Sequence, residues 1–293
     1  MQEQTTQQAS AFIAVVGRPS VGKSTLMNTI CGHKVSIVSP VPQTTRNRVR
    51  GIYTDERGQL VFMDTPGYHD SERTFNNYMM GLIRQSVDDA DLVLRVIDLS
   101  RPIGSEESSL SELLQPAADR TIVALNKADL VRGDAPLVDV PQGLKSVRLS
   151  ATSGEGVDDL LSVLYAAAPH GPLLYPPEFY TDQEPTFRVS EIVREQTMLK
   201  TREELPHALY VETTDLSEDK DGKVLVAGAT IFVDRESQKG IVVGKGGRMI
   251  QRIREDSERE LGDIFERRVR VHLKVKVHPK WRNKSDVIKK LIS

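Results

Sequence analysis

The fold is decided by Gly17-Arg18-Pro19-Ser20-Val21-Gly22-Lys23-Ser24-Thr25. The apolar run 12–16 before this stretch predicts a buried strand, and residues 26–30 after it predict a helix. A strand, a G-x-x-x-x-G-K-[ST] loop and a helix in this order predict a phosphate site made of backbone N–H groups and a helix N-terminus. There Lys23 can reach the β- and γ-phosphates of a nucleotide, and the Ser24 hydroxyl can bind Mg²⁺. The alternative is an ordinary glycine-rich turn with a chance lysine, which the motifs farther along the chain disfavour.

The composition indicates a globular protein of two domains, because 293 residues are many for one core. No apolar run approaches the length of a membrane span, and the polar residues 1–10 do not have the order of a signal peptide. We expect these ten residues to form a flexible tail. The single cysteine, Cys31, excludes an internal disulfide, and the cytoplasm is the simplest compartment.

Charge is unevenly distributed along the chain, although the whole chain has a formal net charge of −2. From Lys239 to the end there are 16 basic and 7 acidic residues, a net charge of +9. This excess indicates a polyanionic partner for the C-terminal part, although a solvated charged surface would give the same count.

Two later stretches contain candidate residues for the Mg²⁺ ion and the γ-phosphate. The segment 35–46 is rich in proline and hydroxyl residues, and in such a loop a threonine can complete the Mg²⁺ shell when a γ-phosphate is present. We assign that role to Thr45, with Thr44 as the alternative. The paired strands 49–54 and 59–63 then lead into Asp64-Thr65-Pro66-Gly67, where Asp64 can hold the metal through water and the Gly67 amide can touch the γ-phosphate.

A further pair of stretches predicts which base is bound. Asn126-Lys127-Ala128-Asp129 follows the strand 121–125, and a carboxylate at Asp129 can accept from both the ring N–H and the exocyclic amine of guanine. The Asn126 amide can contact the other edge of the base, and the backbone of Ser150-Ala151 can meet the guanine oxygen. A helix-capping turn is the alternative for this motif.

The motifs lie in an alternation of strands and helices that predicts an α/β domain with a mostly parallel sheet flanked by helices. Taken together they resemble the translation-factor-related GTPases, and this resemblance implies GTP as ligand and Mg²⁺ as cofactor. It assigns catalysis to Lys23, Thr45 and Gly67, and the metal to Ser24, Thr45 and Asp64. The residues that it assigns to GTP are Gly17, Arg18, Pro19, Ser20, Val21, Gly22, Lys23, Ser24, Thr25, Asp64, Thr65, Pro66, Gly67, Asn126, Lys127, Asp129, Ser150 and Ala151.

Two positions depart from the pattern of these GTPases. Tyr68 stands where Ras-like enzymes have a water-positioning glutamine, so we expect slow intrinsic turnover. Ser20 stands where many relatives have an asparagine that in several of them helps to bind K⁺, so the resemblance gives no support for K⁺ as a cofactor.

A second domain follows a proline-rich stretch, which we interpret as a linker at 170–184 between a GTPase domain at 11–169 and a domain at 185–293. We predict the order helix, strand, strand, GXXG helix, helix, strand for the second domain. Its last strand, at 269–278, alternates apolar with basic residues or histidine.

Gly244-Lys245-Gly246-Gly247 lies before a helix and resembles the GXXG loop of a type II KH domain, in which glycines let a single-stranded nucleic acid approach. A glycine-rich helix start without a ligand is the alternative. The residues that we assign to RNA are Ile241, Gly244, Lys245, Gly246, Gly247 and Arg248.

A GTPase domain followed by a KH domain resembles the Era family of GTPases. The resemblance implies a GTP-hydrolysing switch that binds the 3′ end of 16S rRNA and assists maturation of the small (30S) ribosomal subunit. It also implies contact with the inner face of the plasma membrane, for which the basic segment 280–284 is a candidate, and we expect a monomer. The alternative is a membrane-peripheral signalling GTPase whose KH-like domain docks a protein. A third, an ATP-dependent kinase, is opposed by the guanine motif.

Overall fold

The computed structural model describes residues 8–41, 44–68, 74–102, 104–131 and 143–292, and it divides into two units. Unit 1 comprises Met1–Ser36, Pro42–Asp182 and Leu291–Ser293, and unit 2 comprises Ile37–Val41 and Gln183–Lys290. Among the described residues, no helix is both long and apolar enough to cross a bilayer.

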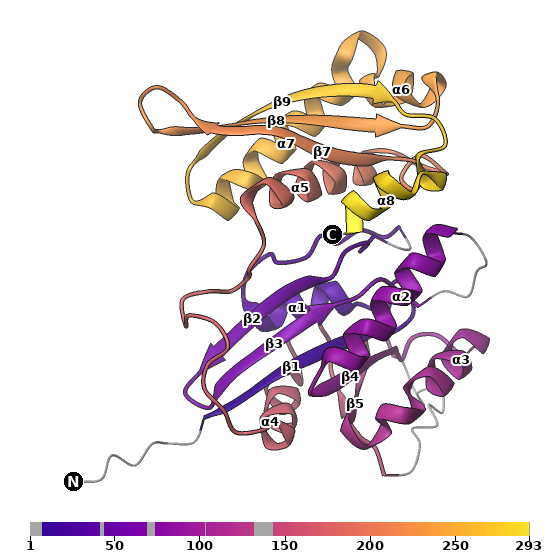
Figure 1. Ribbon diagram of the computed structural model, residues 1–293, viewed down its shortest axis with the longest axis vertical. Helices are drawn as coiled ribbons and strands as arrows, with labels where there is room; N and C mark the ends of the chain where they lie inside the picture. Colours follow the sequence, from indigo (N-terminus) through magenta and orange to yellow (C-terminus); the bar gives the residue numbers. More distant parts are fainter. Residues whose placement is uncertain (1–7, 42–43, 69–73, 103, 132–142, 293) are drawn as a thin grey trace. The chain divides into compact units, whose positions relative to one another are not determined.

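Unit 1 is built on a six-stranded sheet in the order β2-β3-β1-β4-β5-β6 (Figure 1). The strands are β1 (Ala9–Val16), β2 (Val49–Asp55), β3 (Gly58–Asp64), β4 (Leu92–Asp98), β5 (Thr121–Asn126) and β6 (Lys145–Arg148). β2 runs antiparallel to β3, and the other neighbouring pairs are parallel. The carboxyl ends of β3, β4 and β5 therefore deliver Asp64, Asp98 and Asn126 to the same edge of the sheet, where α/β proteins bind their ligands.

The helices of unit 1 are α1 (Lys23–Cys31), α2 (Thr74–Asp89), α3 (Ser105–Leu114) and α4 (Val157–Ala167). Buried side chains of α2 and α3 pack with alternate residues of β1 and with Met63 of β3 in one cluster. α1 lies over the opposite face, because its Met27 packs on Gly51, which pairs with Phe62, the neighbour of Met63. The mostly parallel sheet with helices on both faces confirms the predicted fold class.

The predicted tail and linker both differ from the structure. β1 begins at Ala9, inside the stretch 1–10 that we expected to be a tail; residues 1–7 lie outside the described residues. Within the predicted linker 170–184, the Gln59 side chain accepts hydrogen bonds from the backbone of Leu174 and Tyr175 and donates one to Tyr175 O. This part of the linker therefore packs on the sheet, and unit 1 extends to Asp182.

Unit 2 is a three-stranded sheet in the order β7-β8-β9, with β7 antiparallel and β9 parallel to β8. The strands are β7 (Tyr210–Glu218), β8 (Val224–Val233) and β9 (Arg268–Val277), and the helices are α5 (Pro185–Lys200), α6 (Glu236–Val243), α7 (Arg248–Phe265) and, up to Lys290, α8 (Ser285–Ile292). Apolar residues of α5, α6 and α7 share one core with alternate residues of β8 and β9. This arrangement confirms the predicted KH fold.

Two details of unit 2 were not predicted. Ile37, from the segment after α1, is buried in its core, and the backbone N–H of Val38 donates to Glu195 of α5 at 2.7 Å. Trp281 is fully buried and its indole N–H donates to Ala208 O, so it is a core residue and not part of a surface for phosphate or lipid.

Candidate functional site

The phosphate loop joins β1 to α1, and neighbouring atoms approach it so closely that a side chain does not fit at Gly17 or Gly22. A Cβ at Gly17 would lie 2.5 Å from the Val96 carbonyl oxygen, and one at Gly22 would overlap the Asn126 amide. Gly22 also has φ +99°, a left-handed conformation that favours glycine, immediately before the first residue of α1. The loop is therefore fixed around the start of the helix, as phosphate binding requires.

The Lys23 ammonium lies inside the loop. Its Nζ donates to the carbonyl oxygens of Gly17 at 3.0 Å and Arg18 at 3.1 Å, and the side chain is buried. Burial lowers the pKa of Lys23 to about 8, against the opposing attraction of Asp64 and Glu107. A phosphate placed in the loop would supply the counter-charge that this buried ammonium lacks.

The three residues assigned to the metal come together at the end of β3. Ser24 Oγ donates to Asp64 Oδ2 at 2.6 Å, Thr45 Oγ1 lies 3.3 Å from the same oxygen, and the two hydroxyls are 3.0 Å apart. Asp64 is fully buried, and burial raises its pKa against the attraction of Lys23 and the hydroxyl hydrogen bonds. Its other oxygen, Oδ1, is buried and has no hydrogen-bond partner. A set of hydroxyl and carboxylate oxygens with one unsatisfied carboxylate oxygen fits Mg²⁺.

The Asp64-Thr65-Pro66-Gly67 stretch is fastened beside the phosphate loop. Thr65 Oγ1 donates to Val15 O at 2.7 Å, and the N–H of Tyr68 donates to Gly17 O at 3.1 Å. A Cβ at Gly67 would lie 2.7 Å from Pro19 Cα, so only glycine lets the two loops touch. The Tyr68 ring is buried in the cluster between the sheet, α2 and α3.

The base motif lies at the end of β5. Asp129 is exposed, so its carboxylate is accessible to a base. The Asn126 amide, however, donates to Val21 O at 2.8 Å and accepts from Ala151 N at 2.9 Å. Asn126 thus ties the phosphate loop to the Ser150-Ala151 loop. Its contact with guanine stays a prediction.

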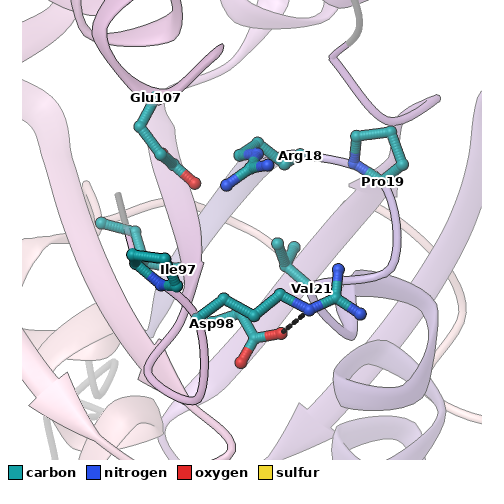
Figure 2. A pocket seen from close by; sticks show the side chains of 8 residues that line it. Arg18, Pro19, Val21, Ile97, Asp98 and Glu107 are labelled. Carbon is teal, nitrogen blue, oxygen red and sulfur yellow. Dashed lines mark ion pairs between the residues drawn. The ribbon is translucent and has the colours of Figure 1, made fainter. Parts of the chain in front are cut away.

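Asp98 was missed by the sequence analysis, although it ends β4 at the same edge of the sheet. Its carboxylate accepts from Lys127 Nζ at 2.7 Å. It also forms an ion pair with Arg101, drawn as the dashed line in Figure 2. Burial would raise the pKa of Asp98, but hydrogen bonds from Lys127 and Ser100 outweigh it, so the pKa lies below its usual value. Asp98 and Ser20 O together fix the Lys127 ammonium, because its Nζ donates to both. The sequence signal that could have identified Asp98 was its position at the carboxyl end of a predicted strand, where α/β proteins bind ligands.

The loop assigned to RNA lies between α6 and α7 in unit 2. Gly246 and Gly247 have φ values of +63° and +76°, and a Cβ at either glycine would meet no atom within 4 Å. Lys245 and Arg248 are exposed, as is Ile241, of which 54% is accessible. The loop is therefore open to a ligand and carries positive charge, as the sequence predicted.

Comparisons with known proteins agree with both parts of this geometry. A family model described as "50S ribosome-binding GTPase" matches residues 12–127, and a KH domain model matches residues 204–282. The GTPase Era of Treponema denticola is 45% identical over 96% of this chain and 99% of its own length. The GTPase Era of Borrelia garinii subsp. bavariensis is 43% identical over 97% of this chain and 99% of its own.

Two solved structures resemble the whole chain, each with a TM-score of 0.93, 33% identity and coverage of 98% of this chain and 99% of the other. One is an Aquifex aeolicus Era variant bound to GDP and AlF4⁻. The other is Era in complex with MgGDPNP and nucleotides 1506–1542 of 16S ribosomal RNA.

Proposed function

Since this chain belongs to the Era family of GTPases, we propose that its GTP cycle controls binding to the 3′ end of 16S rRNA during maturation of the small ribosomal subunit. GTP hydrolysis and rRNA binding are the activities of this family, and the chain carries a site for each. The observation that carries the proposal is the convergence of Ser24, Thr45 and Asp64 beside Lys23, in a chain that also has an open GXXG loop.

Hydrolysis is attack by water on the γ-phosphorus, and the chain contributes mainly electrostatic positioning. Lys23 stabilises negative charge on the β- and γ-phosphates, and the Gly67 amide lies beside the loop to contact the γ-phosphate. Mg²⁺, held by Ser24 and Thr45 with Asp64 acting through water, would neutralise phosphate charge. Tyr68 has no amide with which to orient water and its ring is buried, so unstimulated turnover is slow. The proposal includes no K⁺ site.

Guanine is selected by the carboxylate of Asp129, which accepts from the two donors on one edge of the base. Asp98 supports this selection by holding the Lys127 stem, which covers the ring. The Asn126 side chain binds Val21 O and the Ala151 N–H, so it also supports the pocket beside its proposed contact with the other edge of the base.

The GXXG loop is the proposed RNA contact, with Lys245 and Arg248 facing phosphates and Ile241 offering apolar surface to a base. The test is filter binding of the full chain to an oligonucleotide of the 16S rRNA 3′ end at two salt concentrations. Changing Lys245→Asp together with Gly246→Asp should abolish binding and leave GTP affinity unchanged. In wild type, affinity should fall steeply with salt, because phosphate contacts release counterions.

A matched control exists in the exposed turn between β7 and β8. Lys220→Asp with Lys223→Gln changes the net charge by the same three units away from the loop, and both lysines are exposed. This control should retain RNA binding. If both variants lost RNA affinity equally, the loss would be due to net charge and not to the GXXG loop. Unchanged RNA affinity in the loop variant would favour a protein-docking role.

The signalling alternative is not favoured, since the relatives are Era proteins over their whole length and one Era structure holds 16S rRNA. We further propose that the protein is a cytoplasmic monomer with a peripheral membrane contact. Sedimentation velocity would test the monomer, and cell fractionation would test the location.

A further inference from the structure

Ser36 is a third hydroxyl on the Asp64 carboxylate, and no role was assigned to it above, although it lies in the hydroxyl-rich segment 35–46. Its Oγ donates to Asp64 Oδ2 at 2.7 Å, close to the 2.6 Å of the Ser24 hydrogen bond. Ser36 is only 2% exposed, so no bulk water competes for this interaction. The hydrogen bond from Ser36 is therefore a buried, well-formed element of the Asp64 site.

The backbone of Ser36 is held in turn by Asn28, which lies one helical turn after Ser24 on α1. Asn28 Oδ1 accepts from the N–H groups of Val35 at 2.9 Å and Ser36 at 2.8 Å, and its Nδ2 donates to Ser36 O at 2.7 Å. Residues four apart share one face of a helix. One face of α1 thus delivers two hydroxyls to one oxygen of Asp64, Ser24 directly and Ser36 through Asn28.

Binding of Mg²⁺ would affect the Ser36 hydroxyl differently from the hydroxyls of Ser24 and Thr45. Ser24 and Thr45 are the residues assigned to the metal, so they would leave Asp64 when Mg²⁺ is bound. Ser36 has no such assignment, and its backbone is fixed by two hydrogen bonds to Asn28, with a third from Asn28 to the N–H of the preceding residue, Val35. It is therefore the donor that can stay on Oδ2 and keep the carboxylate oriented, while the unpartnered Oδ1 remains available.

We propose that Ser36, clamped by Asn28, is a positioning residue that orients the Asp64 carboxylate for Mg²⁺; this inference rests on the proposed GTPase function. Groups that orient a metal-binding carboxylate typically change metal affinity by 10–100-fold when they are removed. The effect should therefore appear in the response to Mg²⁺ and not in nucleotide binding without metal.

The experiment measures three quantities on the full chain: affinity for a fluorescent non-hydrolysable GTP analogue in EDTA, the Mg²⁺ concentration that gives half of the metal-dependent gain in that affinity, and the melting temperature. Ser36→Ala should leave the affinity in EDTA within about twofold and raise the Mg²⁺ midpoint by about tenfold. Ser36→Thr, which keeps the hydroxyl, should restore the midpoint. Asn28→Ala should raise it as well, and serves as the second variant if Ser36→Ala does not fold.

Ser86→Ala is the matched control, because this serine of α2 is buried, its hydroxyl has no hydrogen-bond partner, and no role in nucleotide or metal binding is assigned to it. It should not move the Mg²⁺ midpoint. The inference is overturned if Ser36→Ala titrates with Mg²⁺ as wild type does, or if its affinity falls equally in EDTA. A wild-type chain that does not bind the GTP analogue, or shows no Mg²⁺ response, would instead overturn the proposed function.

Discussion

At the residue scale, the buried ammonium of Lys23 links nucleotide binding to pH. Its pKa is about 8 in the unliganded protein, and a bound phosphate favours the charged form and raises that value. Binding above pH 8 must then take up a proton, so GTP affinity should fall as pH rises through 8, by about tenfold at pH 9. Isothermal titration between pH 7 and 9 measures this fall.

The control for this titration is Lys23→Arg, because arginine keeps its charge throughout the range. This variant is expected to bind more weakly and with little pH dependence over the same interval. A wild-type affinity that stays constant from pH 7 to 9 would show that the Lys23 ammonium is charged before nucleotide arrives.

Asp129 carries the choice of base, and the structure leaves its carboxylate exposed. Asp129→Asn replaces one acceptor oxygen with a donor facing another donor, so GTP affinity should fall by about 3 kcal/mol, roughly a hundredfold. Xanthosine triphosphate, which has an oxygen in place of the exocyclic amine, should bind the variant better than GTP does. Direct titration of both nucleotides measures the exchange, and wild-type protein that binds ATP as tightly as GTP would contradict it.

Most of this site was predictable at the residue scale because its chemistry is local in sequence. The spacing of Gly17, Gly22 and Lys23 predicts the phosphate loop without knowledge of the fold. The hydrogen bonds of the Asn126 side chain within the protein were not predictable, because its partners, Val21 and Ala151, come from two other loops. The same holds for Ser36, whose partner on β3 lies 28 residues away in the chain.

At the element scale, the strands were predicted better than two of the helices, α2 and α8, which the sequence analysis did not predict. The strand expected at 269–278 is β9 (Arg268–Val277), because its apolar and basic residues alternate. The predicted order of the second domain includes a helix on each side of the GXXG loop, and these are α6 and α7. α6 forms although Ile241-Val242-Val243 favours a strand, and only Val242 of these is buried. Its start is fixed by Gln238, whose side chain accepts from the backbone N–H groups of Asp234 and Arg235.

The stretch after α4 behaves as an added edge of the sheet of unit 1. Its Tyr180 carbonyl oxygen accepts from Ile52 N of β2 at 2.9 Å, and Gln59 of β3, which is fully buried, binds the backbone of residues 174–175. Proline-rich composition predicted correctly that no helix or strand crosses it, but composition does not tell a packed segment from a free one.

Gln59→Ala should therefore destabilise the protein, because it leaves backbone N–H groups of the packed stretch without their acceptor. The expected loss is about 1–3 kcal/mol in the free energy of unfolding, measured by urea denaturation. Gln115→Ala, at an exposed position, should change stability by no more than about 0.5 kcal/mol. Equal midpoints for the two variants would show that the stretch is bound too weakly to matter.

At the scale of the whole molecule, each of the two units contains segments that are not contiguous in the sequence. The segment Ile37–Val41 belongs to unit 2, although residues on both sides of it belong to unit 1. The sequence predicts a loop there, and nothing local shows that Val38 pairs with Glu195, 157 residues away. Long-range contacts of this kind are what single-sequence patterns leave out.

This division predicts that a residue in the first fifth of the chain stabilises the KH domain. Ile37 is buried among apolar side chains of unit 2, so Ile37→Ala should reduce the stability of that unit by about 2–4 kcal/mol. Trp281 is the single tryptophan of the chain and is fully buried in the same unit, so its fluorescence during urea denaturation follows the unfolding of unit 2.

Val38→Ala is the control, because the Val38 side chain is 38% exposed and the substitution keeps the backbone N–H that binds Glu195. It should shift the tryptophan-detected midpoint by no more than about 0.5 kcal/mol in equivalent stability. The same reasoning predicts that a fragment 185–293, which lacks Ile37, unfolds at lower urea than unit 2 does in the full chain. If the fragment and the full chain gave the same urea midpoint for unit 2, the segment Ile37–Val41 would contribute nothing to the stability of the KH core, and this result would contradict the expected effect of Ile37→Ala.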